Sequence, residues 1–136
     1  MKPKVLIIPC SGIGKTYGSV AREAAFRVTE DLRPEESQLL PLSLLVLGEE
    51  ETRETLARVP VIAIDGCKLS CAAKVAAEKG GKVEQSLQVL DVFRRYRDLK
   101  PDGIAELNEA GNQLAQALAE EVAMLVDQMK GEVENA

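Results

Sequence analysis

The chain has 136 residues, which is the length of one domain, and its net charge of -5 with scattered bases argues against a nucleic-acid-binding protein. Apolar residues make up 46% and aromatic residues only 3%, so the core must be aliphatic. No apolar run approaches the roughly 20 residues that span a membrane, and the N-terminal run is too short for a signal peptide. We therefore expect a cytoplasmic protein that contacts neither nucleic acid nor membrane.

The chain contains three cysteines and no histidine. An odd number of cysteines in a reducing compartment does not suit a disulfide framework, and points instead to metal binding or thiol chemistry. The lack of histidine removes the commonest nitrogen ligand and the usual general base near neutral pH. Any bound metal must therefore be held by thiolate, carboxylate, backbone or water.

The first part of the chain predicts a strand, a glycine-rich turn and a helix. Residues 4–9 form a continuous apolar run bounded by prolines, which is typical of a strand buried on both faces of a parallel sheet. Apolar residues then recur at helical spacing over residues 17–32, with Thr16 as the N-cap and Pro34 as the stop. This order is the opening of a βαβ unit.

The same pattern continues to the end of the chain. The expected elements are a strand over 38–42, a connection, a charged helix over 49–59, a strand over 61–65, a helix capped by Ser70 and ending near 79, a strand over 83–90, and a long helix started by residues 101–103. Residues 91–99 read as one or two helical turns. The whole predicts a single three-layer, Rossmann-like α/β domain with a largely parallel four-stranded sheet and helices on both faces. Its ordered core spans about 4–130, and 131–136 is expected to be a frayed tail.

The three cysteines all fall where strands end or helices begin. Cys10 follows the first strand, Cys67 follows the strand over 61–65, and Cys71 opens the next helix, where the helix dipole favours a thiolate. Ligands of parallel sheets bind beyond the carboxyl ends of the strands, so we expect the three thiols to converge there. The spacing of Cys67 and Cys71 alone would be a weak metal signal, and the addition of Cys10 strengthens it.

Zinc is the metal that this set of ligands suits best. Zinc takes four ligands in tetrahedral geometry, so a fourth donor is needed beside the three sulfurs. Asp65 is one candidate, although it could also be a base or a helix cap, and water or substrate is the other; Asp91 reads as a helix cap. Three thiolates could also hold an iron–sulfur cluster. A third interpretation is a metal-free redox enzyme with Cys71 as nucleophile, Cys67 as resolving thiol and Cys10 as a third member.

The turn after the first strand could bind an anion. Gly14-Lys15-Thr16 is similar to the end of a nucleotide-binding phosphate loop, but the first glycine of that pattern would fall on Pro9. A phosphatase loop would need arginine at position 16. We expect instead that a small anion or other small molecule is held by backbone and side-chain groups of Ser11, Gly12, Gly14 and Lys15. The apolar stripe of the long helix reads as core, with part of it available to a homodimer.

Two motifs in this order identify a family resemblance. They are residues 9–15 (Pro-Cys-Ser-Gly-Ile-Gly-Lys) and residues 65–72 (Asp-Gly-Cys-Lys-Leu-Ser-Cys-Ala), joined by residues 18–24 (Gly-Ser-Val-Ala-Arg-Glu-Ala). The chain resembles the DGC-domain family, zinc-binding proteins named for the Asp-Gly-Cys motif, from about residue 4 into the last helix. The resemblance implies chelation by four cysteines. Cys10, Cys67 and Cys71 match, but the middle segment has no fourth cysteine, which favours three sulfurs and a fourth position that is open or filled by oxygen.

Overall fold

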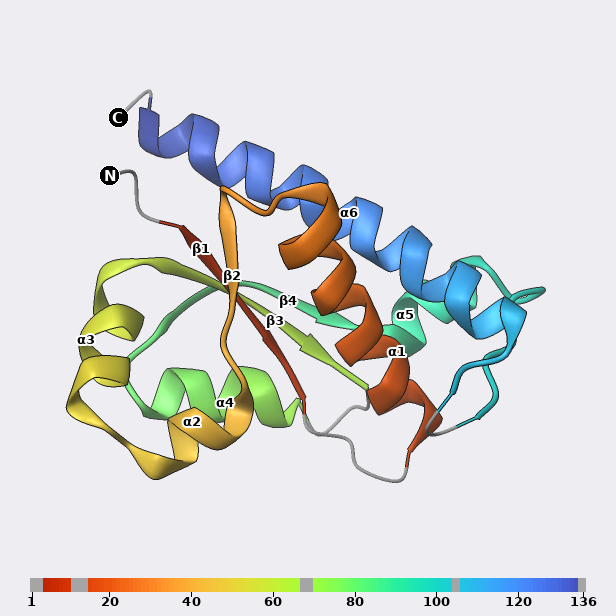
Figure 1. Ribbon diagram of the computed structural model, residues 1–136, viewed down its shortest axis with the longest axis horizontal. Coiled ribbons are helices and arrows are strands. Elements are labelled where there is room, and N and C mark those ends of the chain that lie inside the picture. Colours follow the sequence, from red (N-terminus) through yellow and green to blue (C-terminus); the bar gives the residue numbers. More distant parts are fainter. Residues whose placement is uncertain (1–3, 11–14, 67–69, 104–105, 135–136) are drawn as a thin grey trace.

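The computed structural model describes residues 4–10, 15–66, 70–103 and 106–134, with side chains as far as Lys130. Four parallel strands form one sheet in the order β2-β1-β3-β4 (Figure 1). The strands are β1 Val5–Pro9, β2 Ser37–Leu39, β3 Pro60–Asp65 and β4 Lys82–Gln88. Helices cover both faces of this all-parallel sheet, which confirms the predicted three-layer α/β architecture.

The connections between strands run in opposite directions across the sheet. The path from β1 to β2 contains α1 Thr16–Phe26, which continues as a π-helix, η1 Arg27–Leu32. The paths from β2 to β3 and from β3 to β4 contain α2 Leu42–Leu47, α3 Glu50–Arg58 and α4 Cys71–Glu78. Such crossovers are right-handed, so the reversal places α1 on one face and α4 with α2 on the other. After β4, α5 Val89–Arg95 and α6 Glu109–Glu134 return to the α1 face, where α6 packs along α1 (Figure 1).

The two central strands carry the core. Every residue of β1 is buried, and so is every residue of β3 except the half-buried Pro60. This explains why their sequences are continuous apolar runs, because both faces of a central parallel strand are covered by helices. The edge strand β4 has no fully buried residue and therefore shows a weaker pattern.

The structure differs from the expectations in the segment after β2. The expected strand over 38–42 is the three-residue β2, and the expected connection contains α2. Pro41 has the extended backbone of an N-cap, and Gly48 ends the helix with a left-handed φ of 68°. Only Leu45 of α2 is fully buried, so the apolar sequence does not show a helical stripe.

The boundaries of β4 and α5 differ from those expected from the spacing of apolar residues. Val89 belongs to α5 and not to the fourth strand, whose pairing with β3 shifts register at Val61/Ile62. Asp91 lies in the first turn of α5 and pairs with Arg94, while Gln88 occupies the N-cap position, so the prediction of a cap at Asp91 is wrong.

The long helix α6 begins at Glu109, several residues after the start expected at residues 101–103. Asn108 caps it, because its Oδ1 accepts a hydrogen bond of 2.8 Å from the Gly111 N–H. At α1, the N-cap position is Lys15 and not the expected Thr16. Among the residues described, no helix is long and apolar enough to cross a membrane.

Two arginines near the end of the first helix fix α6 in place. Arg27 donates to Gln116 and Asn112 of α6 at 3.0 and 3.1 Å. Arg33 donates from Nε and from its terminal nitrogen to the two carboxylate oxygens of Asp127, each at 2.7 Å. The Arg33 guanidinium holds the pKa of Asp127 below its usual value.

The Arg33–Asp127 pair predicts a measurable contribution to stability. Asp127→Asn should lower the free energy of unfolding at neutral pH by about 0.5–1 kcal/mol. The ion pair is bidentate, which strengthens it, but both side chains are partly exposed to water, which weakens it. Because the folded-state pKa is depressed, this contribution is present above the ordinary value of 3.8 and is lost as the pH falls through the folded-state pKa. Urea unfolding of both proteins across the acid range measures the difference.

Asp91→Asn is the control, because the Asp91–Arg94 pair spans 3.5 Å and both side chains are more than half exposed. It should cost less than half of the Asp127→Asn loss. Equal losses in the two variants, or a difference for Asp127→Asn that persists in acid, would contradict the assignment.

Candidate functional site

The site lies where the strand order reverses. β1 and β3 are neighbours, but the chain continues from β1 to β2 at one side and from β3 to β4 at the other, and parallel α/β sheets bind ligands at such a point. Pro9 of β1 pairs with Ile64 of β3. Cys10, which follows β1, and Asp65, the last residue of β3, therefore lie at the same level of this edge.

Cys10 is fixed against the end of β3 by its backbone and by its side chain. Its N–H donates to the Ile64 carbonyl at 2.9 Å, which extends the ladder by one residue. Its Sγ accepts a hydrogen bond of 3.2 Å from the Gly66 N–H, and the residue is only 8% exposed. The position of the Cys10 sulfur is therefore fixed at the end of β3.

Gly66 lets the end of β3 approach the first turn of α1. A Cβ atom at this position would lie 2.8 Å from both the Tyr17 carbonyl carbon and the Gly18 nitrogen, so no side chain fits. These neighbours are backbone atoms and cannot rotate away. The glycine is thus required by space, and it places its own N–H within reach of the Cys10 sulfur.

Asp65 caps helix α4 from outside the helix. The side chain is 1% exposed, and its two oxygens accept hydrogen bonds from the Ala72 N–H at 2.8 Å and the Ala73 N–H at 3.2 Å. Burial raises the pKa of Asp65, while the two N–H donors and the Lys74 charge act in the opposite direction. Of the three functions that the sequence left open for Asp65, the structure shows the cap.

Ser70 occupies the N-cap position of α4, as expected, but its side chain does not cap the helix. Its backbone is left-handed, with a φ of 52°, and its Oγ accepts a hydrogen bond of 2.9 Å from Gln88 of β4. The capping oxygens come from Asp65 instead, seven residues before Ala72. The sequence left a cap open for Asp65 but favoured Ser70 for α4, because Ser70 directly precedes the helix.

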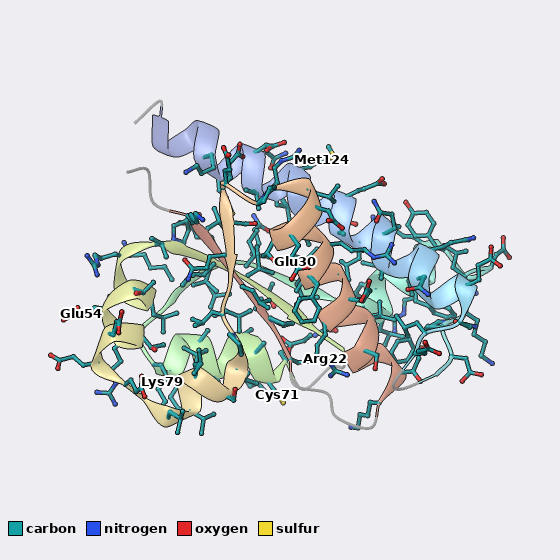
Figure 2. The ribbon with its side chains drawn as sticks, in the orientation of Figure 1. Arg22, Glu30, Glu54, Cys71, Lys79 and Met124 are labelled. Carbon is teal, nitrogen blue, oxygen red and sulfur yellow. The ribbon has the colours of Figure 1, made fainter. Side chains whose placement is uncertain are left out.

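Cys71 is the first residue of α4, and its side chain is exposed. Figure 2 shows it toward the carboxyl end of β1, and α4 contacts β1. Within the described ranges no three cysteine, aspartate or glutamate side chains are grouped closely enough to hold a metal. Cys67 lies outside those ranges, as do Ser11, Gly12 and Gly14 of the expected anion loop; Lys15 is described and is exposed. Convergence of three thiols therefore stays a prediction.

Two pockets that the sequence did not predict flank this edge. A pocket of about 130 Å³ reaches Cys10 and is lined by the ends of β1 and β2, the start of α2 and two side chains of α1, Arg22 and Phe26. A pocket of about 540 Å³ lies between α1 and the start of α6 and shares both α1 side chains. The only sequence signal was that Ser19, Arg22, Glu23 and Phe26 repeat at helical spacing on the face opposite the buried alanines.

The sequence of this chain matches the model of one protein family. A family model for the DGC domain matches residues 6–111, which run from β1 into the first turn of α6 and include all three cysteines. No curated protein and no solved structure matches the chain. Since the match covers well over half of the 136 residues, the chain belongs to the DGC-domain family.

Proposed function

We propose that this protein binds zinc through the thiolates of Cys10, Cys67 and Cys71, with a water molecule or another oxygen donor in the fourth position. The observation that carries the proposal is the hydrogen bond from the Gly66 N–H to the Cys10 Sγ at 3.2 Å. It joins the first cysteine motif directly to the Asp-Gly-Cys motif, although the two residues are 56 positions apart. Cys67 is the next residue in the chain after Gly66.

The donor set fits zinc chemically. Sulfur ligands suit zinc, and metal-binding thiolates are stabilised by N–H donors in the surrounding shell. The chain has no histidine and no fourth cysteine, so oxygen is the remaining protein or solvent ligand. When bound with an open position, zinc supplies Lewis acidity and lowers the pKa of a coordinated water.

In this proposal Asp65 positions the site and does not bind the metal. A water oxygen is the fourth zinc ligand. Both carboxylate oxygens already accept N–H donors from α4, which fixes the start of that helix relative to β3. Cys71 is the first residue of the helix that this cap holds. We keep a reducing, cytoplasmic location as part of the proposal, because metal-binding thiols must stay reduced.

A metal-free thiol redox protein is the second candidate, and the exposure of Cys71 favours it. An exposed thiol at the start of a helix is open to oxidants and to other thiols. In that case Cys67 and Cys71 would form a disulfide under mild oxidation, with no metal needed.

Metal content of three single variants tests the first proposal. The wild type purified without chelator should contain one zinc ion per chain. Cys10→Ser, Cys67→Ser and Cys71→Ser should each lose most of it, because a zinc site with only two sulfurs binds far more weakly. Thiol titration adds an independent readout: zinc should protect the exposed Cys71 from alkylation, whereas the metal-free protein should react there first.

Ser86→Ala, a change at an exposed polar residue of β4, is the control and should keep full zinc content. If the wild type holds no metal and its Cys71 reacts equally with and without added zinc, the zinc proposal is wrong. Formation of a Cys67–Cys71 disulfide in such metal-free protein would establish the second candidate.

Two glycine variants distinguish an effect on the geometry of the site from an effect on the stability of the whole protein. Gly66→Ala forces a Cβ against the backbone of Tyr17 and Gly18, which should cost about 1–3 kcal/mol of unfolding free energy. It should also weaken zinc binding by about tenfold or more, because the N–H donor to Cys10 must move.

Gly80→Ala is the matched control. Gly80 has a φ of 95° and open space around it, so alanine there should cost a similar 1–3 kcal/mol through backbone strain, but far from the site. Its zinc affinity, measured with a competing chelator, should equal that of the wild type. Equal affinity losses in the two variants would mean that Gly66 acts through stability alone.

A further inference from the structure

The turn before α4 contains a residue with a strained backbone. Ser70 has a φ of 52° and a ψ of 45°, and among the described residues it is the only one other than glycine with a positive φ. A left-handed backbone brings the Cβ of an L-residue too close to the carbonyl oxygen that follows it, and serine seldom adopts it. Such a conformation persists only where the surrounding structure holds it, so contacts to Ser70 must supply that constraint.

Gln88 holds Ser70 from a strand that follows later in the chain. It is the last residue of β4, and it pairs with Asp65, the last residue of β3. Its Nε2 donates a hydrogen bond of 2.9 Å to the Ser70 Oγ, across 18 positions of sequence. The turn before α4 is therefore tied to the carboxyl end of the edge strand β4.

Cys71 lies between two residues that are each bonded to the end of a strand. Ser70, before it, accepts a hydrogen bond from Gln88 of β4. Ala72, after it, donates its N–H to Asp65 of β3 at 2.8 Å. The helix α4 contacts both of these strands (Figure 1). The backbone that carries the exposed Cys71 side chain is thus fixed on both sides.

We propose that Gln88 is a positioning residue for Cys71 and acts through Ser70. The hydrogen bond keeps Ser70 in the left-handed conformation, and this conformation sets the direction in which α4 starts and its first side chain leaves the backbone. The importance for zinc rests on the proposed function, in which Cys71 is a metal ligand; Gln88 itself does not bind the metal. Residues that orient a ligand without touching the metal contribute to metal affinity.

The zinc affinity of a matched pair of variants tests the proposal. Gln88→Leu removes the donor and keeps a similar side-chain volume, so it should weaken zinc binding about tenfold or more, as measured with a competing chelator. Gln85→Leu is the control, because Gln85 is an exposed residue of the same strand that pairs with Ile62. It should bind zinc as the wild type does. Equal affinity of Gln88→Leu and the wild type would overturn the positioning role and leave the zinc proposal intact.

Substitutions of Ser70 show whether the left-handed backbone carries the effect. Ser70→Ala removes the acceptor, and its combination with Gln88→Leu should lose no more affinity than the weaker-binding single variant, because the same hydrogen bond is broken in all three proteins. Ser70→Gly also lacks the hydroxyl, but glycine adopts the left-handed backbone without strain, so it should bind zinc more tightly than Ser70→Ala. Equal affinities of these two Ser70 variants, or additive losses in the double variant, would contradict the proposal.

The visible spectrum of cobalt(II), bound in place of zinc, separates positioning from stability. Its bands depend on the number and geometry of the ligands, and not on the stability of the fold. At saturating cobalt, Gln88→Leu and Ser70→Ala should show altered bands. Gln85→Leu should show the wild-type spectrum, and so should Gly80→Ala, which strains the backbone away from the site. A wild-type spectrum for Gln88→Leu would mean that this residue acts on stability alone.

Measurements on the metal-free protein distinguish a failure of this inference from a failure of the zinc proposal. The three-bond coupling between the amide and α protons of Ser70, measured by NMR, reports its φ. It should fit a left-handed backbone in the wild type and in Gln85→Leu, and it should change in Gln88→Leu. An unchanged coupling in folded Gln88→Leu overturns the positioning role. A wild type that binds neither zinc nor cobalt overturns the zinc proposal, and the NMR result then decides by itself whether Gln88 positions Cys71.

Discussion

The arrangement of the candidate site depends on how closely the end of β3 approaches the first turn of α1. Gly66 packs directly against the backbone of Tyr17 and Gly18, with no room for a Cβ. This contact sets how closely the end of β3 approaches α1, and it directs the Gly66 N–H at the Cys10 sulfur. A larger residue would push the end of β3 away from α1 and displace that donor. The glycine of the Asp-Gly-Cys motif is therefore needed for packing, because its φ lies outside the left-handed region.

Asp65 provides the second constraint, and it acts across the same turn. A buried carboxylate is costly unless it is hydrogen-bonded, and here the free N–H groups at the start of α4 supply the bonds. The helix gains a cap, and the charge gains the favourable end of the helix dipole. The end of β3 and the start of α4 are thus tied together, which fixes Cys71 relative to the strand that precedes the motif. The first two residues of the Asp-Gly-Cys triplet thus fix the end of β3 relative to α4 and α1.

The sequence predicted those features that depend on burial alone. The continuous apolar runs of β1 and β3 identify central parallel strands, and their ends place Cys10 and Asp65 at one edge. The residues that cap the helices were predicted less well, because several polar residues near each helix start can reach its free N–H groups and the sequence does not show which one does. For α4 the sequence favoured the adjacent Ser70 and left a cap open for Asp65, and Asp65 supplies the capping oxygens; the cap of α6 comes from Asn108, which lies in a polar stretch without a clear start signal. The helix α2 was missed because its exposed apolar residues, such as Val46 and Leu47, hide the periodicity that a surface helix normally shows.

Helix α1 connects the thiol edge to the larger pocket, and its composition explains how. Its buried side carries small residues, Ala21, Ala24 and Ala25, which let it lie close to the sheet and to α6. A helix so tightly held has little freedom to shift, so the backbone positions from which its outer side chains project are fixed. Arg22 and Phe26 project from that face into both pockets, while the first turn of the same helix is pinned by Gly66. The larger pocket and the sheet edge that carries Cys10 therefore both depend on the position of α1. A substitution that displaced the first turn of α1 would change the geometry of both.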